Sequence, residues 1–574
     1  MTRQIPRRTV LAAAPLALAA CGREGPYFGS TSRPARQRLV YANGNEPDVF
    51  DPGTYAGGTE MRIINALFDG LTKFHPVTLE PMAGLATHHE ASGGSTWFRF
   101  YLRGHPRPRG IRFANTDDLP SEFSHGHRAP PDDVPARWSD GALITAHDFV
   151  YSWRRVVDPQ TGSADASYFY CIANAEDIHR GKRPPDDLGV RAPDDFTLEV
   201  DLPTPAVHFL ALQTQRCFLP VPRHAIEKGL EWGRVVSGAF QLKEWRSHER
   251  VVLVRNPAYY ESAAVTIEEI VFLPVKHNLL VSLYKAGDVD ATDGGYMRPQ
   301  FIRALRGKRD FRCIPMLERG DYAINVRQPP FDNVLLRYAL NMATDKKAIV
   351  AALEAGQSPA LGCVPPMKGY EPVTNMPVVV DGVSFDVLRY DPEGARSLLA
   401  KAGFPNGVGP GGRRLSLDLT FSGARTVEEI IQQQWRANLN IEVKLEPRDF
   451  VMWIRALLDL SYRGVCQGGW TGKYPDPATF LDLFQSGSVQ SGTGWSDPKF
   501  DARLAAADAA PSLAARMQRL AECEKFLLAA MPLIPIHFQV YSSLVKPYVR
   551  GWASNALNEH LFKYVWIDTN WRPA

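Results

Sequence analysis

The sequence predicts an α/β chain built as two lobes, because strand-like and helix-like patterns alternate in both of its halves. Its 574 residues exceed what one hydrophobic core holds and indicate about three or four domains. Apolar residues make up 45% and charged residues 22% of the chain, which is typical of a soluble globular protein. The 45 prolines and 45 glycines indicate many turns and loops and argue against a helical bundle.

The first 20 residues have the pattern of an export signal and are excluded from the fold. Three arginines, at positions 3, 7 and 8, make the start of this segment positive. An apolar run over residues 10–20 follows, which is too short to span a bilayer. Residues 18–21, Leu-Ala-Ala-Cys, resemble a bacterial lipobox, so we expect Cys21 to be lipidated and to become the mature N-terminus. The alternative is an unprocessed apolar N-terminus. Arg7 and Arg8 also resemble a twin-arginine motif, so the export route stays open.

The charge balance of the mature chain argues against nucleic-acid binding. Residues 1–20 hold three of the 65 Lys and Arg residues and none of the 62 Asp and Glu residues, so their removal leaves the two signs balanced. Six cysteines follow Cys21 and none forms a C-x-x-C pair, so we expect neither a zinc site nor a redox motif. Export permits disulfides, whose pairing the sequence leaves open.

In the first half of the chain, polar turns separate strand and helix patterns. Residues 21–38 are rich in Gly, Pro, Ser and Arg and predict a flexible tether ahead of the fold. The clearest helix begins after Thr145, which forms a box-like cap with Asp148, and it ends at Asp158. The other elements expected here are helices near 60–68 and 279–285 and strands at 39–41, 97–103, 196–202, 251–254 and 270–273.

Residues 104–137 interrupt this alternation with prolines, charges and three histidines. No Asp, Glu or Cys stands at a diagnostic spacing from His125 and His127, so we predict a mobile surface insertion here, and a metal site is the weaker alternative. We expect neither a metal nor a cofactor in this protein.

The second half repeats the alternation. A helix is expected at 335–349, and another begins at Pro392 after the cap Asp391 and ends at Gly403. Strands at 415–419 and 441–445 flank a helix near 426–439, and a last helix runs from residue 513 to about residue 530.

The stretch 468–477, Gly-Gly-Trp-Thr-Gly-Lys-Tyr-Pro-Asp-Pro, has the composition of a ligand-binding segment. Glycines let a second backbone approach closely, and Trp470 and Tyr474 add flat apolar area with a polar edge. Such a segment can lie beside an extended ligand and bond it through main-chain groups. The alternative is a tight corner with an aromatic cap.

Nine short motifs stand in a fixed order along most of the chain, at 45–47, 67–72, 138–141, 148–155, 238–245, 284–290, 330–333, 337–340 and 469–477. No single motif is specific, but together and in this order they resemble the solute-binding proteins of ABC importers for oligopeptides. The resemblance extends from residue 39 nearly to the C-terminus.

This resemblance implies a two-lobed periplasmic-binding-protein fold of the large three-domain class, with a hinge and an extra domain inserted in the first lobe. We accordingly expect the first lobe at 39–80, 207–315 and 540–574, the inserted domain at 81–206 and the second lobe at 316–539. The resemblance also implies a peptide that lies extended between the closing lobes and is bonded mainly through its backbone.

The resemblance further implies a set of site residues. The second-lobe ligand strand corresponds to residues 467–473 and the opposing first-lobe segment to residues 56–58. The expected ligand-binding residues are Gly57, Gly58, Tyr168, Gln467, Gly469, Trp470, Lys473, Tyr474 and Asp476. Lys473 departs from the family, whose members that hold a peptide's α-ammonium have an aspartate there. Asp476 is a candidate substitute, an anionic ligand is the second possibility, and a solvent-facing Lys473 is the third.

The expected function is that of a monomeric receptor, anchored in the periplasm through lipid alone, that captures an oligopeptide-like ligand. It delivers the ligand to a membrane permease, and the ATPase subunits are separate chains because this sequence lacks a phosphate-binding G-x-x-x-x-G-K-[ST] loop. Alternative ligands are a murein peptide, a sugar-phosphate conjugate or a signalling peptide. The rival class is an exported hydrolase, but no G-x-S-x-G motif occurs, and we expect no catalytic residue.

Overall fold

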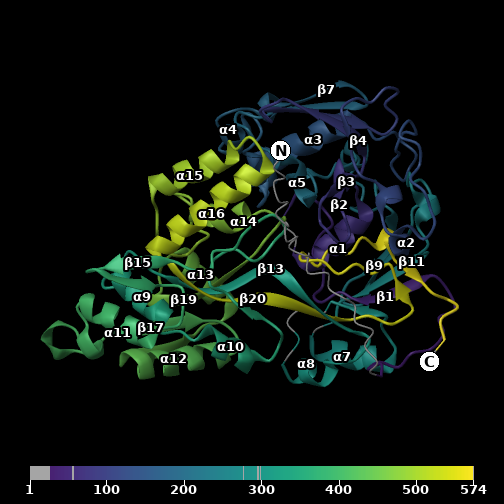
Figure 1. The fold of residues 1–574 in the computed structure, drawn as a ribbon. Coiled ribbons are helices and arrows are strands. Elements are labelled where there is room, and N and C mark those ends of the chain that lie inside the picture. Colours follow the sequence, from purple (N-terminus) through teal and green to yellow (C-terminus); the bar gives the residue numbers. More distant parts are fainter. Residues whose placement is uncertain (1–25, 55–56, 276, 294–296, 298, 573–574) are drawn as a thin grey trace, which may run out of the picture.

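The computed structural model describes residues 26–54, 57–275, 277–293, 297 and 299–572. Figure 1 shows a second lobe at the lower left, a first lobe at the right and an inserted region at the top, around helix α3. Within the described residues no helix combines the length and the hydrophobicity that crossing a bilayer requires.

The first lobe is built on a five-stranded sheet in the order β12-β1-β11-β10-β9. Strand β1 (Arg38–Ala42) pairs in parallel with both β11 (Glu269–Leu273) and β12 (Ala291–Thr292). Strands β10 (Arg250–Arg255) and β9 (Phe240–Arg246) extend the sheet in antiparallel fashion. The parallel pairs need long crossover connections, so residues near 40, 270 and 290 meet in one sheet.

The inserted region contains a second five-stranded sheet in the order β6-β4-β5-β8-β7. Its strands are β6 (Ile111–Arg112), β4 (Ala86–Ala91), β5 (Trp97–Leu102), β8 (Thr197–Asp201) and β7 (Val190–Asp194). Helix α3 (Ala146–Val157) packs on β7 and β8. The predicted cap is present, because the Asp148 carboxylate accepts a 2.8 Å hydrogen bond from the Thr145 amide.

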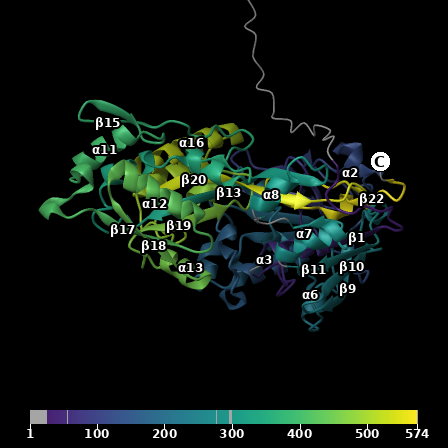
Figure 2. The same cartoon turned by 90° about the horizontal axis from the view of Figure 1, so that it is seen from below.

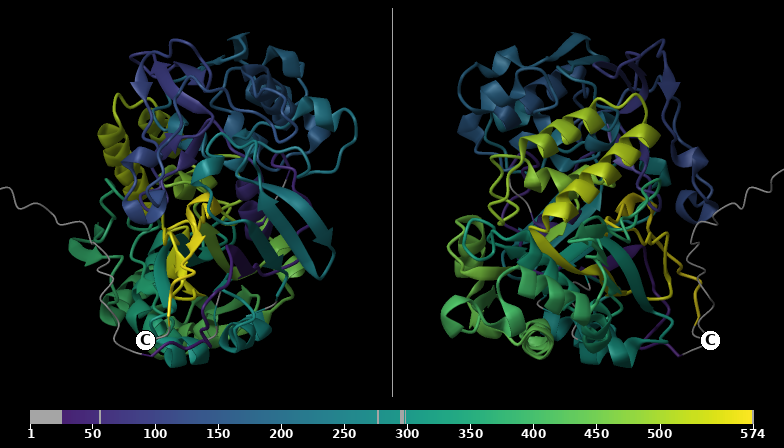
Figure 3. Two further views of the ribbon diagram at one scale, coloured as in Figure 1. Left: turned by 90° about the vertical axis from the view of Figure 1, so that its right-hand side faces the viewer. Right: turned by 60° about the vertical axis from the view of Figure 1, so that its left-hand side comes forward.

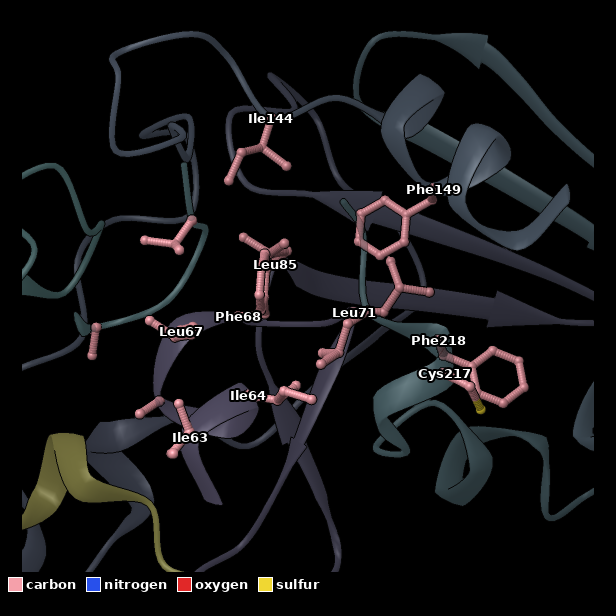
Figure 4. Close-up of a cluster of buried hydrophobic side chains, with 14 of the residues drawn as sticks. Ile63, Ile64, Leu67, Phe68, Leu71, Leu85, Ile144, Phe149, Cys217 and Phe218 are labelled. Carbon is pink, nitrogen blue, oxygen red and sulfur yellow. The ribbon is translucent and has the colours of Figure 1, made fainter. Parts of the chain in front are cut away.

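The first lobe and the inserted region share one hydrophobic core. Ile63 and Leu67 of α1 (Gly58–Leu67) belong to the same buried cluster as Phe149 of α3 and Phe218 (Figure 4). A shared core couples the two regions mechanically, so the inserted region packs as part of the first lobe. The domain boundaries given above remain a prediction.

The second lobe is built on a six-stranded sheet in the order β14-β20-β13-β19-β17-β18. Its strands are β14 (Ser358–Pro359), β20 (Leu533–Leu544), β13 (Phe311–Ile324), β19 (Gly464–Thr471), β17 (Ser416–Phe421) and β18 (Glu442–Pro447). Helices of this lobe include α9 (Val334–Met342), α10 (Lys346–Leu353), α11 (Pro392–Lys401), α12 (Thr426–Leu439) and α16 (Leu513–Ala530). The single helix expected at 335–349 is therefore wrong, because Asp345 starts α10 by accepting a hydrogen bond from the Ala348 amide.

The paired strands β13 and β20 run from one lobe into the other (Figures 1 and 2). Phe311 and Leu544 lie in a small cluster with residues of the first lobe, whereas Ile324 and Ile534 lie in the core of the second lobe. The pairing register is interrupted between residues 315 and 319, in the middle of this crossing. A strand pair that crosses between two cores and is irregular between them suits the hinge that we expect.

The remaining elements are shorter or peripheral, and the α15–α16 pair (yellow-green) comes forward in the right-hand view of Figure 3. They are helices α2 (Ser121–Ser124), α4 (Ala175–His179), α5 (Phe209–Leu212), α6 (Arg223–Ile226), α7 (His277–Ala286), α8 (Pro299–Leu305), α13 (Phe450–Leu458), α14 (Ala478–Leu481) and α15 (Pro498–Asp508), and the strand pairs β2 (Thr72–Phe74) with β3 (Pro81–Ala83), β15 (Pro377–Val380) with β16 (Val383–Asp386), and β21 (Val549–Arg550) with β22 (Trp566–Ile567).

Two segments expected to be flexible are bonded to the fold. Residues 21–25 of the predicted tether lie outside the described residues, but its later part is docked. The Tyr27 ring packs edge-on against Trp571, and the amides of Phe28 and Gly29 donate to the Asp310 carboxylate at 2.9 and 3.0 Å. In the insertion at 104–137, Phe123 is buried and its ring packs edge-on against Tyr564. Both segments contact parts of the chain hundreds of residues away, which local composition does not encode.

Candidate functional site

The candidate site is centred on the last residues of strand β19, which leave the core of the second lobe. Residues 464–466 are buried and pair with β17, and residues 465–466 also pair with β13. Residues 467–471 continue to pair with β13, but the β17 pairing ends at Cys466. Among the described residues, no strand pairs with this part of β19 on its other side. The result is an open strand edge to which an extended chain can add.

The glycines of this edge have a structural reason that the sequence analysis did not foresee. A Cβ on Gly468 would lie 2.5 Å from a carboxylate oxygen of Asp321, and a Cβ on Gly469 would lie 3.0 Å from the Arg319 carbonyl oxygen. Arg319 and Asp321 form a buried ion pair with 2.5 Å between the charged atoms. The glycines therefore accommodate this ion pair on β13, while Gly469 itself stays exposed.

Trp470 lies half-buried against the second-lobe core. Its indole Nε1 is shielded from solvent and has no hydrogen-bond partner among the described residues. The Nζ of Lys473 lies 5.7 Å from the centroid of the Trp470 ring, within the range of a cation–π interaction.

The backbone of Lys473 is held from both lobes. Its amide donates to the Thr479 hydroxyl at 3.2 Å, within the second lobe. Its carbonyl accepts a 2.8 Å hydrogen bond from the side-chain amide of Gln215, which belongs to the first-lobe side. This hydrogen bond joins the two lobes directly at the end of the open strand edge.

A fixed ion pair lies next to Gln215. The Arg216 guanidinium pairs with Asp165 and donates to the Pro52 carbonyl at 3.1 Å. Arg216 is buried, so these contacts hold the chain just before the first-lobe segment at 57–58. The chain therefore brings together three segments, at 52–54, at 215–216 and at Lys473. Of these three, the sequence analysis named only Lys473 as a site residue.

Lys473 and Asp482 are exposed side chains whose pKa values are shifted by the protein around them. Both residues are exposed, yet desolvation by the surrounding protein lowers the pKa of Lys473 and raises the pKa of Asp482 to about 8. Arg216 adds to the lowering for Lys473 and Asp165 opposes it, while Asp508 adds to the raising for Asp482. A side chain that water reaches although protein crowds it is typical of a cleft wall.

Asp482 is a site residue that the sequence analysis missed. It is the single acid in the run Phe-Leu-Asp-Leu-Phe at 480–484, and an isolated carboxylate in an apolar run was the available signal. It influences the pKa of Tyr168 and of Tyr474, which places it among the predicted aromatic residues of the site.

Asp476 does not provide the free carboxylate that Lys473 lacks. It is buried and forms two hydrogen bonds with the Arg516 guanidinium, at 3.0 and 3.1 Å, which lower its pKa despite burial. The idea that Asp476 substitutes for a ligand-binding aspartate is therefore wrong in this arrangement. Tyr474 is also buried, and it packs into the core of the first lobe and inserted region.

The other predicted residues lie around the same place. Gly57 is the N-cap of α1 and Gly58 is its exposed first residue, whereas Ala56 lies outside the described residues. Tyr168 is half-buried, and desolvation and Asp165 raise the pKa of its hydroxyl. The Gln467 side chain accepts a 2.9 Å hydrogen bond from the Ser422 amide, so its carbonyl oxygen is already engaged.

The arrangement suits binding better than catalysis. The described residues contain no group of three or more His, Cys, Asp or Glu side chains able to hold a metal ion. The site offers an open strand edge, an indole and a lysine from one lobe, and a buried ion pair and helix-starting glycines from the other. These groups can enclose an extended polar chain and hold its main-chain atoms.

Comparisons with known proteins agree with this arrangement. The family model of bacterial extracellular solute-binding proteins, family 5 Middle, matches residues 135–492. The chain is 32% identical over 535 residues to the periplasmic oligopeptide-binding protein OppA of Salmonella typhimurium, covering 90% of each chain. It is 29% identical over 535 residues to the periplasmic murein peptide-binding protein MppA of Escherichia coli, covering 91% of each.

Solved structures give the same result. The structure of the Escherichia coli murein tripeptide-binding protein MppA superposes with a TM-score of 0.74 at 28% identity, covering 94% of this chain and 99% of that one. Haemophilus influenzae OppA in complex with the peptide RPPGFSPFR gives a TM-score of 0.71 at 27% identity, covering 93% of this chain and all of the other.

Proposed function

Because the chain belongs to the bacterial extracellular solute-binding proteins of family 5, we propose that it captures an oligopeptide or peptide-like ligand in the periplasm and delivers it to the permease of an ABC importer. The ATPase subunits of that importer are separate chains. The protein acts as a monomer and releases its ligand chemically unchanged. Gel filtration checks that the protein is a monomer, and analysis of the released ligand checks that the ligand is chemically unchanged.

The open edge of β19 is the observation that carries this proposal. Residues 467–471 pair with β13 alone among the described residues. The Gln467 carbonyl accepts a 2.9 Å hydrogen bond from the Trp453 indole, so the main chain open to a peptide is that of residues 468–471. Strand addition supplies affinity through backbone hydrogen bonds, which every peptide offers whatever its sequence. The lobe-to-lobe hydrogen bond between Gln215 and the Lys473 carbonyl stands at the end of this edge, where closure would enclose the ligand.

The ligand-binding residues that we propose come from both lobes. Gln467, Gly469, Trp470 and Lys473 belong to the second lobe, Gly57 and Gly58 to the first lobe, and Tyr168 to the inserted region. Tyr474 and Asp476 are given a supporting role, because both are buried and Asp476 is paired with Arg516. Asp482 joins the set as an exposed carboxyl group beside the aromatic residues.

The test is to purify the protein under native conditions and to identify the released ligand by mass spectrometry. We expect peptides, and a tripeptide of murein type is one possible result. Titration of ligand-stripped protein with peptide should change tryptophan fluorescence. The proposal fails if the released material is not peptidic and no peptide binds to the folded protein.

The lipid anchor is a separate proposal that rests on residues 18–21. Cys21→Ser should abolish acyl labelling and release the protein from the membrane fraction, because lipidation at this cysteine would be the only link to the bilayer. A Cys523→Ser variant is a matched control, since that cysteine is buried in the second lobe. Continued labelling of Cys21→Ser would refute the anchor without touching the binding function.

A further inference from the structure

The end of β19 and the turn after it present hydrogen-bond donors for which the described residues provide no acceptor. Lys473 Nζ interacts with the Trp470 ring at 5.7 Å, but among the described residues no carboxylate lies within ion-pair distance of it. Trp470 Nε1 is shielded from water and also has no acceptor in the described part of the chain. An indole N–H that water does not reach needs an acceptor from elsewhere, and the exposed ammonium beside it is free to exchange water for such an acceptor.

The charges nearest to Lys473 do not neutralise it. Asp165 and Arg216 are the two groups whose charges influence its pKa, and they act in opposite directions. The two are ion-paired with each other, and Arg216 is further fixed by the Pro52 carbonyl. Asp165 is thus already committed, and the Asp165–Arg216 pair adds no net charge beside Lys473.

The other carboxyl groups of the site are committed as well. Asp476 is paired with Arg516, and so is Asp508. Asp482 has a pKa raised to about 8, and its charge interactions are with Asp508, Arg516 and Asp476 rather than with Lys473. Within the described residues, the protein therefore contains no counter-ion for Lys473.

We propose that Lys473 is a specificity-determining residue that binds a carboxylate of the ligand, so that peptides with an anionic group at this end bind more tightly than peptides with a free α-ammonium. An ammonium placed beside Lys473 would be repelled, while a carboxylate would gain an ion pair in a partly desolvated place. This inference rests on the peptide-binding function proposed above and names the chemistry of its ligand.

The test uses four tetra-alanine peptides that differ only at their ends. They are the free peptide, the N-acetyl peptide, the N-succinyl peptide and the C-terminal amide. Isothermal calorimetry on ligand-stripped mature protein gives a Kd for each. Succinylation adds a carboxylate at the N-terminus, and amidation removes the one at the C-terminus, so the two arms distinguish the source of the anion.

Three variants accompany the native protein. Lys473→Met removes the charge and keeps the length of the side chain, and Lys473→Asp reverses the charge. Lys444→Met removes an exposed lysine from β18, at the far edge of the same sheet, and serves as the control. Circular dichroism and thermal unfolding establish that all three fold, which we expect because both lysines are exposed.

We expect native protein and Lys444→Met to prefer the succinyl peptide over the free peptide by about tenfold, which corresponds to about 1.4 kcal/mol. Lys473→Met should bring the two within about threefold, and Lys473→Asp should reverse the order. If the C-terminal carboxylate is the group bound, amidation should weaken native binding about tenfold and Lys473→Met should not respond to amidation. Either result supports the inference.

Equal affinities for all four peptides, in native protein and in Lys473→Met alike, would overturn the inference and leave the peptide-binding function intact. Failure of the folded native protein to bind any of the four peptides would refute the proposed function itself. The preference should also weaken at 1 M salt, since the Debye length there is only about 3 Å.

Discussion

Replacing Arg516 by Met should destabilise the second lobe in a way that depends strongly on pH. Arg516 is fully buried and makes two hydrogen bonds to Asp476, which is only 2% exposed. Removal of one partner leaves a buried carboxylate without a counter-ion, and such losses typically cost about 3–5 kcal/mol. Asp476 keeps its 2.9 Å hydrogen bond from the Ala478 amide, which does not compensate a full charge.

The variant can relieve this cost by protonating Asp476, and this sets the pH dependence. Protonating a carboxyl group with an ordinary pKa of about 3.9 costs about 4 kcal/mol at pH 7 and about 1.5 kcal/mol at pH 5. In the native protein the pKa of Asp476 lies below its ordinary value, so its contribution is fully present above pH 4 and is lost only as the pH falls further. In Arg516→Met the folded-state pKa is raised, so the destabilisation should shrink from about 4 kcal/mol at pH 7 to about 1.5 kcal/mol at pH 5.

Neighbouring groups act in the same direction. Burial and then Arg516 lower the pKa of His208 to about 4, so loss of Arg516 makes its protonation easier at low pH. Urea unfolding of the native protein, Arg516→Met and the exposed control Lys525→Met at pH 5, 6 and 7 measures the effect. The double variant Asp476→Asn/Arg516→Met should recover most of the lost stability at pH 7. A destabilisation below about 1 kcal/mol, or one that is the same at pH 5 and pH 7, would refute this reasoning.

Three further predictions concern the site and the second-lobe core. Trp470→Ala should weaken peptide binding by about thirtyfold, or about 2 kcal/mol, whereas Trp566→Ala outside the site should not; equal affinities would exclude Trp470 from the site. Gln215→Leu removes the hydrogen bond to the Lys473 carbonyl, so peptide affinity by calorimetry should fall about fivefold while thermal stability changes little. Lys346→Met should raise the free energy of urea unfolding by about 2 kcal/mol at pH 6 and by less at pH 9. Burial lowers the Lys346 pKa to about 7, so the native protein regains stability as the pH rises from 7 toward 10.5. A gain in stability that does not depend on pH would contradict this.

Local pattern predicted the elements better than it predicted their contacts. Helix α12 occurs at the expected residues 426–439, because its apolar spacing places Ile431, Trp435 and Leu439 in the core. The helix expected at 335–349 is divided because α9 ends at Met342, with Ala343 as its C-cap, and Asp345 then caps α10. A cap in the middle of an apolar pattern is easily missed when the pattern is continuous on both sides.

The sequence analysis centres the candidate site on Trp470, which stays a prediction, and it did not anticipate the partners that reach this stretch from other parts of the chain. The stretch around Trp470 stands out by composition, and its glycines and aromatic residues lie where the two lobes meet. The pairing of Asp476 with Arg516 joins residues 40 positions apart, and the docking of Arg33 on the Thr569 carbonyl joins residues 536 positions apart. Such pairings depend on the tertiary fold, so no local pattern in the sequence specifies them.

The docked N-terminal segment has a consequence for how the protein would meet its permease. The seven residue steps from Cys21 to Phe28 span at most about 25 Å, because each extended residue covers about 3.5 Å. From Phe28 onward the chain is bonded to the first lobe through Asp310 and to the C-terminal segment through Thr569.

A tether this short would restrict how freely a receptor anchored at Cys21 rotates above the bilayer. Anchored at Cys21, the protein would keep the first-lobe surface that binds residues 28–37 turned toward the lipid. It would then diffuse in the plane of the membrane toward its permease in a restricted orientation. Confinement of this kind raises the local concentration of receptor at the permease without any new contact. Lengthening the tether with a flexible insert after residue 22 would relax the orientation of the protein and slow delivery of peptide to the permease. The affinity for peptide in solution would stay the same.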